Sequence, residues 1–221
     1  QKVAIQMNDT HPAIAGPELV RILHDERGLP FEEALHITQG CVNYTNHTLL
    51  PEALESWGED LFASLLPRHL QLIDRIDDAH AKAYPARRVA ARSDGRVKMG
   101  ELSFIMSNRV NGVAALHTGL MKTTVFKDLN ALHPDRIVNE TNGVTPRRWV
   151  HSCNPRLSAL ITDTIGTGWV TDLERLEELA PYAEDADFRA AFREAKHANK
   201  IRLRDRLRVR DGIELPTDHM P

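Results

Sequence analysis

Apolar side chains recur three and four residues apart in several long stretches of the chain, which is the spacing of an amphipathic helix. The helices predicted in this way run from Pro17 to Gly28, from Phe31 to Thr38, from Pro67 to Tyr84, from Leu102 to Met121 and from Asp187 to Arg210. The pair Asn111-Gly112 lies in the middle of the fourth helix. Because glycine lowers helix stability, we expect the backbone to approach another segment closely there.

Helix-end signals predict two further helices in the last third of the chain. Asn154-Pro155 is an N-cap followed by proline at the first helical position, and Gly166 ends that helix. Thr171-Asp-Leu-Glu174 has the form of a capping box, which predicts a short helix after it.

Strand signals are fewer. Val3–Met7 is a short β-prone run that ends in the polar loop Asn8-Asp-Thr-His-Pro12. Ligands of open α/β sheets bind outside the carboxyl ends of the strands, so this loop is in the usual position for a ligand. Ser93-Asp-Gly95 is a turn signal that predicts a small hairpin between Arg87 and Met99. The balance of many helices and few strands indicates a helix-rich α/β fold.

Composition and charge exclude several classes of function. The 221 residues carry a formal net charge of −3, so no global basic field would hold nucleic acid or an acidic membrane surface. The arginine-rich segment 200–210 is a local exception, and its interspersed apolar residues favour an amphipathic helix with a solvated basic face. No apolar run approaches the ~18 residues that span a bilayer, and no signal peptide opens the chain. Cys41 and Cys153 lie in unrelated contexts, so we expect no disulfide framework, no thiolate zinc site and a reducing cytoplasm.

Two separated stretches, 41–57 and 141–149, are polar and lack any periodic apolar pattern. Burying each of their polar groups without a partner would cost roughly 1–3 kcal/mol, so the first stretch is expected to be a loop and a poor core segment. Its amide, imidazole and hydroxyl groups suit a ligand that is covered in hydroxyls. We therefore expect a sugar site built from separated loops.

Several residues of these stretches have both a functional and a structural interpretation. His47 can bond a sugar hydroxyl through either ring nitrogen, or it can merely tie its loop together. Asn142 presents a donor and an acceptor together, or it belongs to a linker that leads into a helix. Glu55 and Trp57 follow the turn Pro51-Glu-Ala-Leu54; an acidic residue beside an indole is a common sugar-binding pair and equally a common helix end.

A metal site is a weaker interpretation of the same loops. Asp9, His11 and His47 would provide ligands for a hard or borderline cation. Their spacing is not diagnostic, and no histidine pair at helical spacing or carboxylate cluster accompanies them, so we expect no metal. For Asp9 alone, a cap on the backbone amides of a tight loop is the better interpretation.

Five strings of residues carry a resemblance to a known family. They are Val3-Ala-Ile-Gln-Met-Asn-Asp-Thr-His-Pro12, Tyr44-Thr-Asn-His-Thr-Leu-Leu-Pro-Glu-Ala-Leu-Glu55, Leu66-Pro-Arg-His-Leu70, Val110-Asn-Gly-Val-Ala114 and Thr141-Asn-Gly-Val-Thr-Pro-Arg-Arg-Trp149. In this order they resemble the glycogen, starch and maltodextrin (α-1,4-glucan) phosphorylases, and strings of this length are highly specific. The segment Met99–Arg109 departs from the animal enzymes and is more similar to bacterial ones.

The resemblance implies a two-domain, Rossmann-like (GT-B) glycosyltransferase fold. Residues 1–142 would be the C-terminal part of the N-terminal, glucan-binding domain, and residues 143–221 the start of the C-terminal, cofactor-binding domain. The implied enzyme is a retaining transferase of carbohydrate metabolism, from a family that includes allosteric homodimers. It would catalyse reversible phosphorolysis of terminal α-1,4-linked glucose to glucose 1-phosphate. Since the chain lacks an initiator methionine, we expect it to be an internal fragment of that enzyme.

The resemblance also implies site residues by motif match. His47 would be the catalytic residue: its imidazole would hold the glucosyl 6-hydroxyl, and its backbone carbonyl would lie near the developing oxocarbenium charge. Asn142 would bind the 4- and 6-hydroxyls, and Val113 would line the pocket. The residues that shape the acceptor side, where the glucan chain runs, would be Asp9, His11 and Glu55.

The implied cofactor is pyridoxal 5'-phosphate, and no lysine of this chain is assigned to it. The attachment lysine, the basic residues that hold substrate phosphate and a glycine-rich loop all belong to family segments that this chain lacks. The 221 residues alone are therefore expected to be inactive. The runner-up hypothesis is a non-catalytic glucan-binding or interaction module, and a metal-dependent hydrolase comes third.

Overall fold

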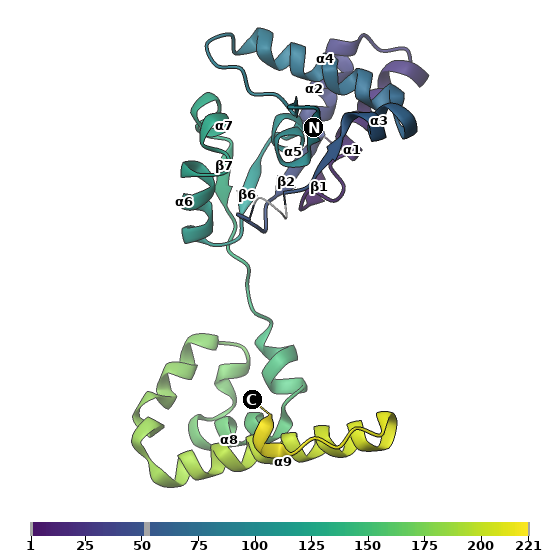
Figure 1. The fold of residues 1–221 in the computed structure, drawn as a ribbon. Helices are drawn as coiled ribbons and strands as arrows, with labels where there is room; N and C mark the ends of the chain where they lie inside the picture. The colour runs from purple at the N-terminus through teal and green to yellow at the C-terminus, as the bar shows by residue number, and fades with distance from the viewer. Residues whose placement is uncertain (1, 51–53, 221) are drawn as a thin grey trace. The chain divides into compact units, whose positions relative to one another are not determined.

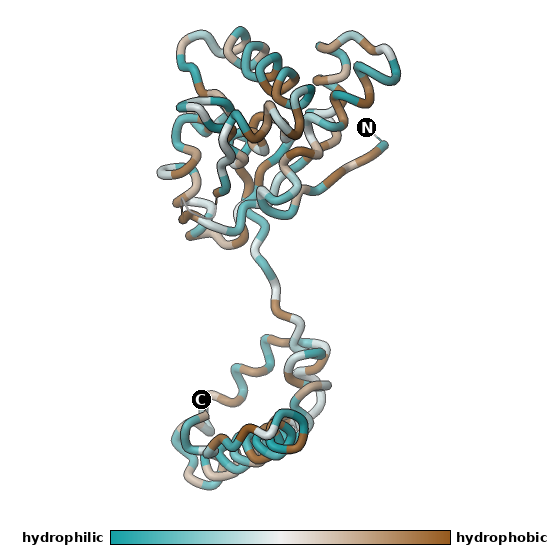
Figure 2. Tube along the Cα trace, turned by 45° about the vertical axis from the view of Figure 1, so that its right-hand side comes forward, coloured by the Kyte–Doolittle hydropathy of each residue, from teal (hydrophilic) through white to brown (hydrophobic). Residues whose placement is uncertain are grey.

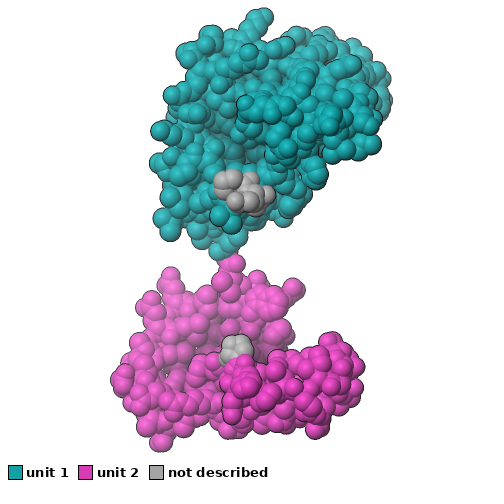
Figure 3. Space-filling view, in the orientation of Figure 1, with its two compact units in different colours: residues 1–142 teal, residues 143–221 magenta. Residues whose placement is uncertain are grey.

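A computed structural model of the chain describes residues 2–50 and 54–220. The chain forms two compact units, Gln1–Asn142 and Gly143–Pro221, which Figures 1 and 3 show. How these units correspond to the domains of a longer protein stays a prediction. None of the helices among the described residues is long and apolar enough to cross a membrane.

A four-stranded parallel sheet organises the first unit. Its strands lie side by side in the order β1 (Ile5–Asn8), β2 (Val42–Thr45), β6 (Val110–Gly112) and β7 (Ile137–Asn139). Met7 lies opposite Tyr44, Tyr44 opposite Val110, and Val110 opposite Ile137. These four side chains are buried, so one face of the sheet is part of the core.

The opposite face of the sheet carries a polar ladder. Gln6 donates through Nε2 to Thr45 Oγ1 at 2.8 Å, and the Thr45 hydroxyl donates to Asn111 Oδ1 at 2.7 Å. Each of the three strands therefore contributes one polar side chain to a hydrogen-bonded row. The prediction that residues 41–57 form one loop is wrong at both ends. At the start, β2 is a strand whose buried residues, Val42 and Tyr44, alternate with half-buried polar ones, and at the end Ser56 and Trp57 belong to a strand of a second sheet.

Helices lie between the strands of this unit (Figure 1). The helices are α1 (Ala15–Arg21), the π-helical η1 (Ile22–Glu26), α2 (Phe31–Cys41), α3 (Glu59–Leu65), α4 (Pro67–Ala83), α5 (Met99–Met106), α6 (Ala115–Thr123) and α7 (Lys127–Leu132). The first three predicted helices are confirmed, and Gly28 follows η1 with a φ of +72°. α4 buries Leu72, Ile73 and Ile76 at the spacing that predicted it.

The predicted helix from Leu102 to Met121 is wrong, because β6 interrupts it. Val110 and Gly112 are buried with Asn111 between them, and pairing with β2 and β7 stabilises the extended backbone. The expected close approach at Gly112 is confirmed: a Cβ at this position would lie 2.9 Å from both Thr118 Cα and Met121 Sδ of α6.

A second, antiparallel sheet consists of β3 (Ser56–Gly58), β5 (Arg96–Lys98) and β4 (Arg92–Ser93), in that order. The predicted hairpin is confirmed. Asp94 and Gly95 form its turn with φ values of +57° and +70°, the left-handed conformation that a type I′ turn requires.

The second unit contains only helical segments and connections among its described residues, 143–220. They are η3 (Arg147–Ser152), α8 (Pro155–Ile165), η4 (Thr167–Val170), η5 (Leu173–Glu184), α9 (Ala186–Asp211) and η6 (Thr217–His219). Asn154 caps α8 as predicted, accepting a hydrogen bond from Leu157 N. The capping box is wrong, because Asp172 precedes the next helical segment and makes no side-chain cap bond. The helix predicted from Asp187 to Arg210 is confirmed as α9, whose tube in Figure 2 mixes hydrophilic and hydrophobic colours. Its basic segment does not bury an apolar face, because Leu203 and Val209 are exposed as well.

A buried pair of histidines predicts how the stability of the first unit depends on pH. His80 of α4 and His133, which follows α7, share a hydrogen bond between their Nε2 atoms at 3.1 Å. Burial lowers the pKa of His80 and lowers that of His133 to about 4, and the nearby Arg136 adds to both effects. A histidine with a depressed folded-state pKa stabilises the fold fully above its unfolded pKa, and this contribution is lost as the pH falls toward the folded value. We therefore expect the pair to lower the free energy of unfolding by about 2 kcal/mol between pH 6.5 and 4, while Asp77 of α4, whose pKa burial raises to about 6, acts in the opposite direction over the same range.

Urea unfolding at these two pH values, followed by circular dichroism, measures this effect. The H133F variant is expected to be destabilised by acid less than the wild type, because phenylalanine keeps an aromatic ring beside Tyr84 and Phe104 but cannot bind a proton, whereas Asp77 is present in both proteins. H36F is the matched control, since His36 is exposed on α2. An unchanged pH difference in H133F would contradict the assignment.

Candidate functional site

The structure places all the predicted site residues except Glu55 in the loops at the carboxyl edge of the parallel sheet. Asp9 and His11 follow β1, His47 follows β2, Val113 follows β6, and Asn142 follows β7. This edge is where ligands of open α/β sheets bind. Residues from distant parts of the sequence therefore lie along one row of strand ends, which are spaced about 4.8 Å apart.

Backbone hydrogen bonds fix where each of these loops begins. Asp9 N donates to Thr45 O at 2.9 Å, and Asn46 N donates to Asn111 O at 2.9 Å. Asn142 N donates to Val113 O at 2.9 Å, so the last two loops are joined as well. The positions of the side chains are thus set by rigid strands, which is how precise sites are built.

His47 is exposed, and its ring is held by one contact. Nε2 lies 2.5 Å from Oδ1 of Asn8, the last residue of β1. An amide oxygen can only accept, so Nε2 carries the proton and Nδ1 of the neutral ring is left as an acceptor. The arrangement thus allows His47 to accept a hydrogen bond from a hydroxyl group.

Asp9 forms a local cap, as the structural interpretation predicted. Its Oδ1 accepts a hydrogen bond from Thr10 N at 2.7 Å, and its backbone is left-handed, with a φ of +68°. Asp9 therefore shapes the loop between β1 and α1, and aspartate is one of the residues that tolerate this conformation.

His11 and Glu55 form a polar pair beside this loop. His11 Nδ1 lies 3.2 Å from Glu55 Oε1, and the buried Thr10 donates through Oγ1 to Glu55 Oε2 at 2.7 Å. Glu55 also has a positive φ of +37°, and its carbonyl accepts from Met99 N at 3.0 Å. Such a backbone costs free energy of order 1–3 kcal/mol in a residue other than glycine, so its surroundings must hold it in place.

The His11–Glu55 pair borders a cleft of about 260 Å³. The opposite wall is apolar and includes Trp57, Leu61 and Leu65, all partly exposed. Glu55 and Trp57 thus line the same cleft, and their role as a sugar-binding pair stays a prediction. The first three residues of the turn expected at 51–54 lie outside the described residues.

Asn142 is the last residue of the first unit, and its side chain is exposed. Val113 is half-buried and accepts from it through the backbone. The described residues contain no group of three or more histidine, cysteine, aspartate or glutamate side chains that would hold a metal ion. In particular, His11 contacts Glu55 and His47 contacts Asn8, so the two histidines have separate partners.

The site contains residues that the sequence analysis did not single out. Asn8, Thr10 and Asn46 each hold one of the predicted site residues or its loop. All three lie within a residue or two of a strand end, inside the two strings that carried the resemblance. Their position at or just after the end of a strand was the signal in the sequence that could have identified them. For Asn46 this signal required that β2 first be predicted as a strand.

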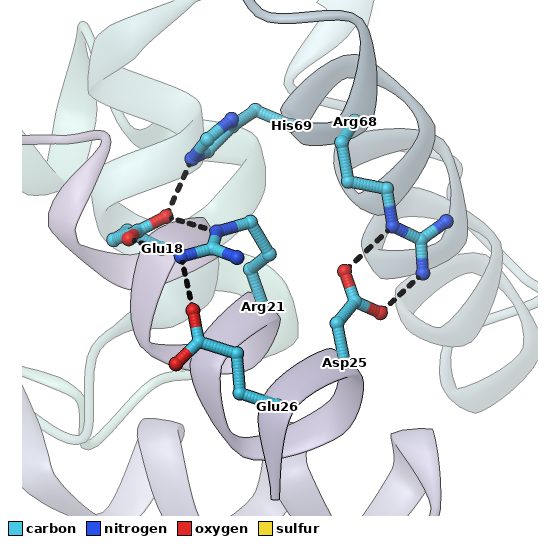
Figure 4. Close-up of polar contacts among 6 residues, drawn as sticks. All are labelled: Glu18, Arg21, Asp25, Glu26, Arg68 and His69. Carbon is cyan, nitrogen blue, oxygen red and sulfur yellow. Dashed lines mark hydrogen bonds and ion pairs between the residues drawn. The ribbon is translucent and has the colours of Figure 1, made fainter. Parts of the chain in front are cut away.

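A network of ion pairs supports the helix that follows the first of these loops (Figure 4). The Glu18 carboxylate of α1 accepts from Arg21 at 2.7 and 2.9 Å and lies 2.8 Å from His69 Nε2 of α4. These partners, Arg21 foremost, lower the pKa of Glu18 to about 2. Arg21 also donates to Glu26 at 2.9 Å.

A second ion pair joins η1, which directly continues α1, to the start of α4. Arg68 donates to both carboxylate oxygens of Asp25, at 2.8 and 2.6 Å, and lowers its pKa. Figure 4 shows the two clusters side by side between α1–η1 and the start of α4. Partly exposed pairs contribute only about 0–1 kcal/mol each, so their main consequence is to fix the orientation of α1.

Comparison with known proteins relates the chain to one family of sequences. The sequence model of a family described as Carbohydrate phosphorylase matches residues 1–220. Glycogen phosphorylase of Haemophilus influenzae is 43% identical over an alignment that covers 97% of this chain and 28% of that protein. Alpha-glucan phosphorylase 2, cytosolic, of Arabidopsis thaliana is 41% identical, with 97% of this chain and 27% of that protein covered.

The brain form of glycogen phosphorylase from Rattus norvegicus is 44% identical over 91% of this chain and 26% of its own length. The chain thus spans about a quarter of the length of these relatives, which are covered to 28%, 27% and 26%. Bacterial, plant and animal proteins match to nearly the same degree, so the bacterial affinity of Met99–Arg109 stays a prediction.

Proposed function

Because the chain belongs to the carbohydrate phosphorylase family, we propose that it is part of an enzyme that phosphorolyses α-1,4-glucans. The proposed reaction transfers a terminal glucosyl unit to inorganic phosphate, giving glucose 1-phosphate with retained configuration. The observation that carries the proposal is that His47, Val113 and Asn142 all lie at the carboxyl edge of the parallel sheet. Each of the three residues belongs to one of the sequence strings that resemble this family. The chain would contribute the wall of the site that contacts the glucosyl unit.

In this proposal His47 and Asn142 bind the hydroxyl groups of the glucosyl unit. The ring of His47, held by Asn8 at 2.5 Å, presents its free nitrogen to the 6-hydroxyl, and Asn142 presents a donor and an acceptor to the 4- and 6-hydroxyls. The backbone carbonyl of His47 is a fixed dipole directed at the positive charge of the transition state. Fixed dipoles of this kind are among the largest contributions to catalysis.

The acceptor side of the proposed site is formed by the loop after β1 and by Glu55. Asp9 shapes this loop, and the His11–Glu55 pair offers a donor and acceptor for sugar hydroxyls. The cleft beside the pair has an indole and apolar walls, which suit the less polar faces of a glucan chain.

Pyridoxal 5'-phosphate is the cofactor that the resemblance implies, and its phosphate would supply the acid of the reaction. A lysine that binds this cofactor as a Schiff base lies in an enclosed pocket. In the described part of the chain every lysine is exposed or half-buried, so none fits this role. We therefore propose that the attachment lysine lies outside this chain, and we assign no part of the cofactor's chemistry to the residues here.

The proposal extends to the architecture of the longer protein. The two units would be the adjoining parts of the N-terminal and C-terminal domains of a GT-B fold, and the longer protein would be a cytoplasmic homodimer. The sheet with its site at the carboxyl edge is consistent with a Rossmann-like domain.

Phosphate-dependent release of glucose 1-phosphate tests the proposed function. We expect the full-length protein to produce it from a linear α-1,4-glucan, and the 221-residue chain alone to produce none, as measured by a coupled phosphoglucomutase assay. If the full-length protein binds the glucan but forms no glucose 1-phosphate with phosphate, the phosphorylase hypothesis is refuted and the non-catalytic glucan-binding module is favoured. If the 221-residue chain alone forms glucose 1-phosphate, the proposal that it contributes only the glucosyl-contacting wall of the site is refuted.

A further inference from the structure

We propose that His117 is a positioning residue that fixes the backbone at His47; this inference rests on the proposed function. His117 lies in the first turn of α6, the helix that begins just after Val113. Its imidazole is half-buried behind the loop that follows β2. It would act without touching the sugar, by holding Asn46, the residue that precedes His47.

The contact between His117 and Asn46 has two parts. His117 Nε2 lies 2.8 Å from the side-chain oxygen of Asn46 and 3.1 Å from its backbone carbonyl oxygen. Both atoms are acceptors, so Nε2 must carry the proton and is shared between them. One imidazole thereby holds both the side chain and the peptide unit that links Asn46 to His47.

The other polar groups of Asn46 are occupied as well. Its backbone N donates to Asn111 O of β6 at 2.9 Å, and its side-chain nitrogen donates to the hydroxyl of Tyr44 at 2.9 Å. Asn46 and Tyr44 are both fully buried, and burial raises the pKa of the Tyr44 phenol, so the hydroxyl stays protonated. Each of the four polar atoms of the buried Asn46 therefore has a hydrogen-bond partner, and these bonds hold its peptide in the observed orientation.

This orientation matters because the Asn46 carbonyl belongs to the peptide bond that enters His47. If its hydrogen bond is removed, the peptide plane can rotate, and both the ring and the carbonyl of His47 move with it. Displacement of a reacting group by about 1 Å can lower a rate about 100-fold. Because α6 begins two residues after Val113, the contact of His117 with Asn46 also joins the loop of Val113 to the loop of His47.

Three substitutions of His117 in the full-length protein separate positioning from general stability. H117F keeps a ring but has no donor, and H117N places its amide nitrogen near the position of Nδ1, too far back to reach Asn46. H117Q places its amide nitrogen near the position of Nε2 and restores the donor. We expect kcat for phosphorolysis to fall roughly 10- to 100-fold in H117F and H117N, with KM for the glucan changed less than about twofold. H117Q is expected to recover most of the loss.

His24 provides the matched control. It is also a half-buried imidazole that holds a loop, with Nδ1 2.7 Å from Leu29 O, but it lies in η1, away from the strand ends. H24F is expected to lower the melting temperature and to leave kcat unchanged within about twofold, since loss of such a contact costs about 1 kcal/mol. A similar fall in kcat in H24F would show that the assay reports stability alone.

Amide hydrogen exchange gives a measurement that is independent of activity. Peptides that contain Asn46 and His47 are expected to exchange faster in H117F than in the wild type, and to be protected again in H117Q. Wild-type kcat in H117F, or a loss that H117Q does not recover, would overturn the positioning role while the proposed function stands. An inactive wild-type protein would instead refute the proposed function, and exchange alone would then decide whether His117 holds this loop.

Discussion

Replacement of His47 by alanine in the full-length protein is expected to lower kcat/KM for phosphorolysis by about 100- to 1000-fold. The substitution removes the ring that Asn8 holds at 2.5 Å, and with it the hydrogen bond that we propose to the substrate hydroxyl. Such a bond tightens as charge develops on the sugar, so the larger part of the loss should appear in kcat. Steady-state rates of glucose 1-phosphate release, measured over a range of glucan concentrations, separate the two parameters.

Two further variants make this test specific. N142A removes the second side chain assigned to the glucosyl hydroxyls and should lower kcat/KM by a comparable amount. H36A is the control for loss of an imidazole, because His36 is exposed on α2 and contacts none of the site residues. Near-normal rates in both H47A and N142A would remove these residues from the site even if the enzyme proved to be a phosphorylase.

Local signals in the sequence predicted those elements whose structure depends on neighbouring residues. Pro67, the apolar stripe through Ile73 and Ile76, and the Asp94-Gly95 turn each determine a helix or hairpin within a few residues. The strand β6 has only three residues, too few to show an alternating pattern, and it is stabilised by pairing with β2 and β7. Its flanking helices have helical spacing, so a local method joins all three into one helix.

The site was predicted through its strings of polar residues, and only in part through physical reasoning. The polar run 41–57 indicated a sugar site, but Tyr44 and Asn46 in that run are fully buried. The penalty for burying polar groups does not apply to them, because each is the other's hydrogen-bond partner. Such pairing depends on tertiary structure, as does the contact of Asn46 with His117, seventy-one residues away. Neither can be inferred from composition or spacing.

Replacement of Gly112 by alanine is expected to lower the free energy of unfolding by about 2–4 kcal/mol, more than any other substitution named above. A Cβ there would lie 2.9 Å from Thr118 Cα and would also collide with Thr118 Oγ1. The hydroxyl can rotate, although it would lose its bond to Asn139 Oδ1, but the Cα is backbone and cannot move unless α6 shifts away from the sheet. Because α6 carries His117, such a shift would also disturb the loop of His47.

Gly119, in the same helix, provides the opposite expectation. A Cβ at Gly119 meets nothing within 4 Å, and alanine is a better helix former than glycine, so G119A should stabilise the fold by about 0.5–1 kcal/mol. Urea unfolding of both variants at pH 7 measures the contrast between them. If G112A unfolds at the same urea concentration as the wild type, then β6 and α6 are not packed as closely as the structure shows, and the link between Gly112 and the site fails. If G119A alone is destabilised, α6 is not helical at that position, and the placement of His117 beside Asn46 fails with it.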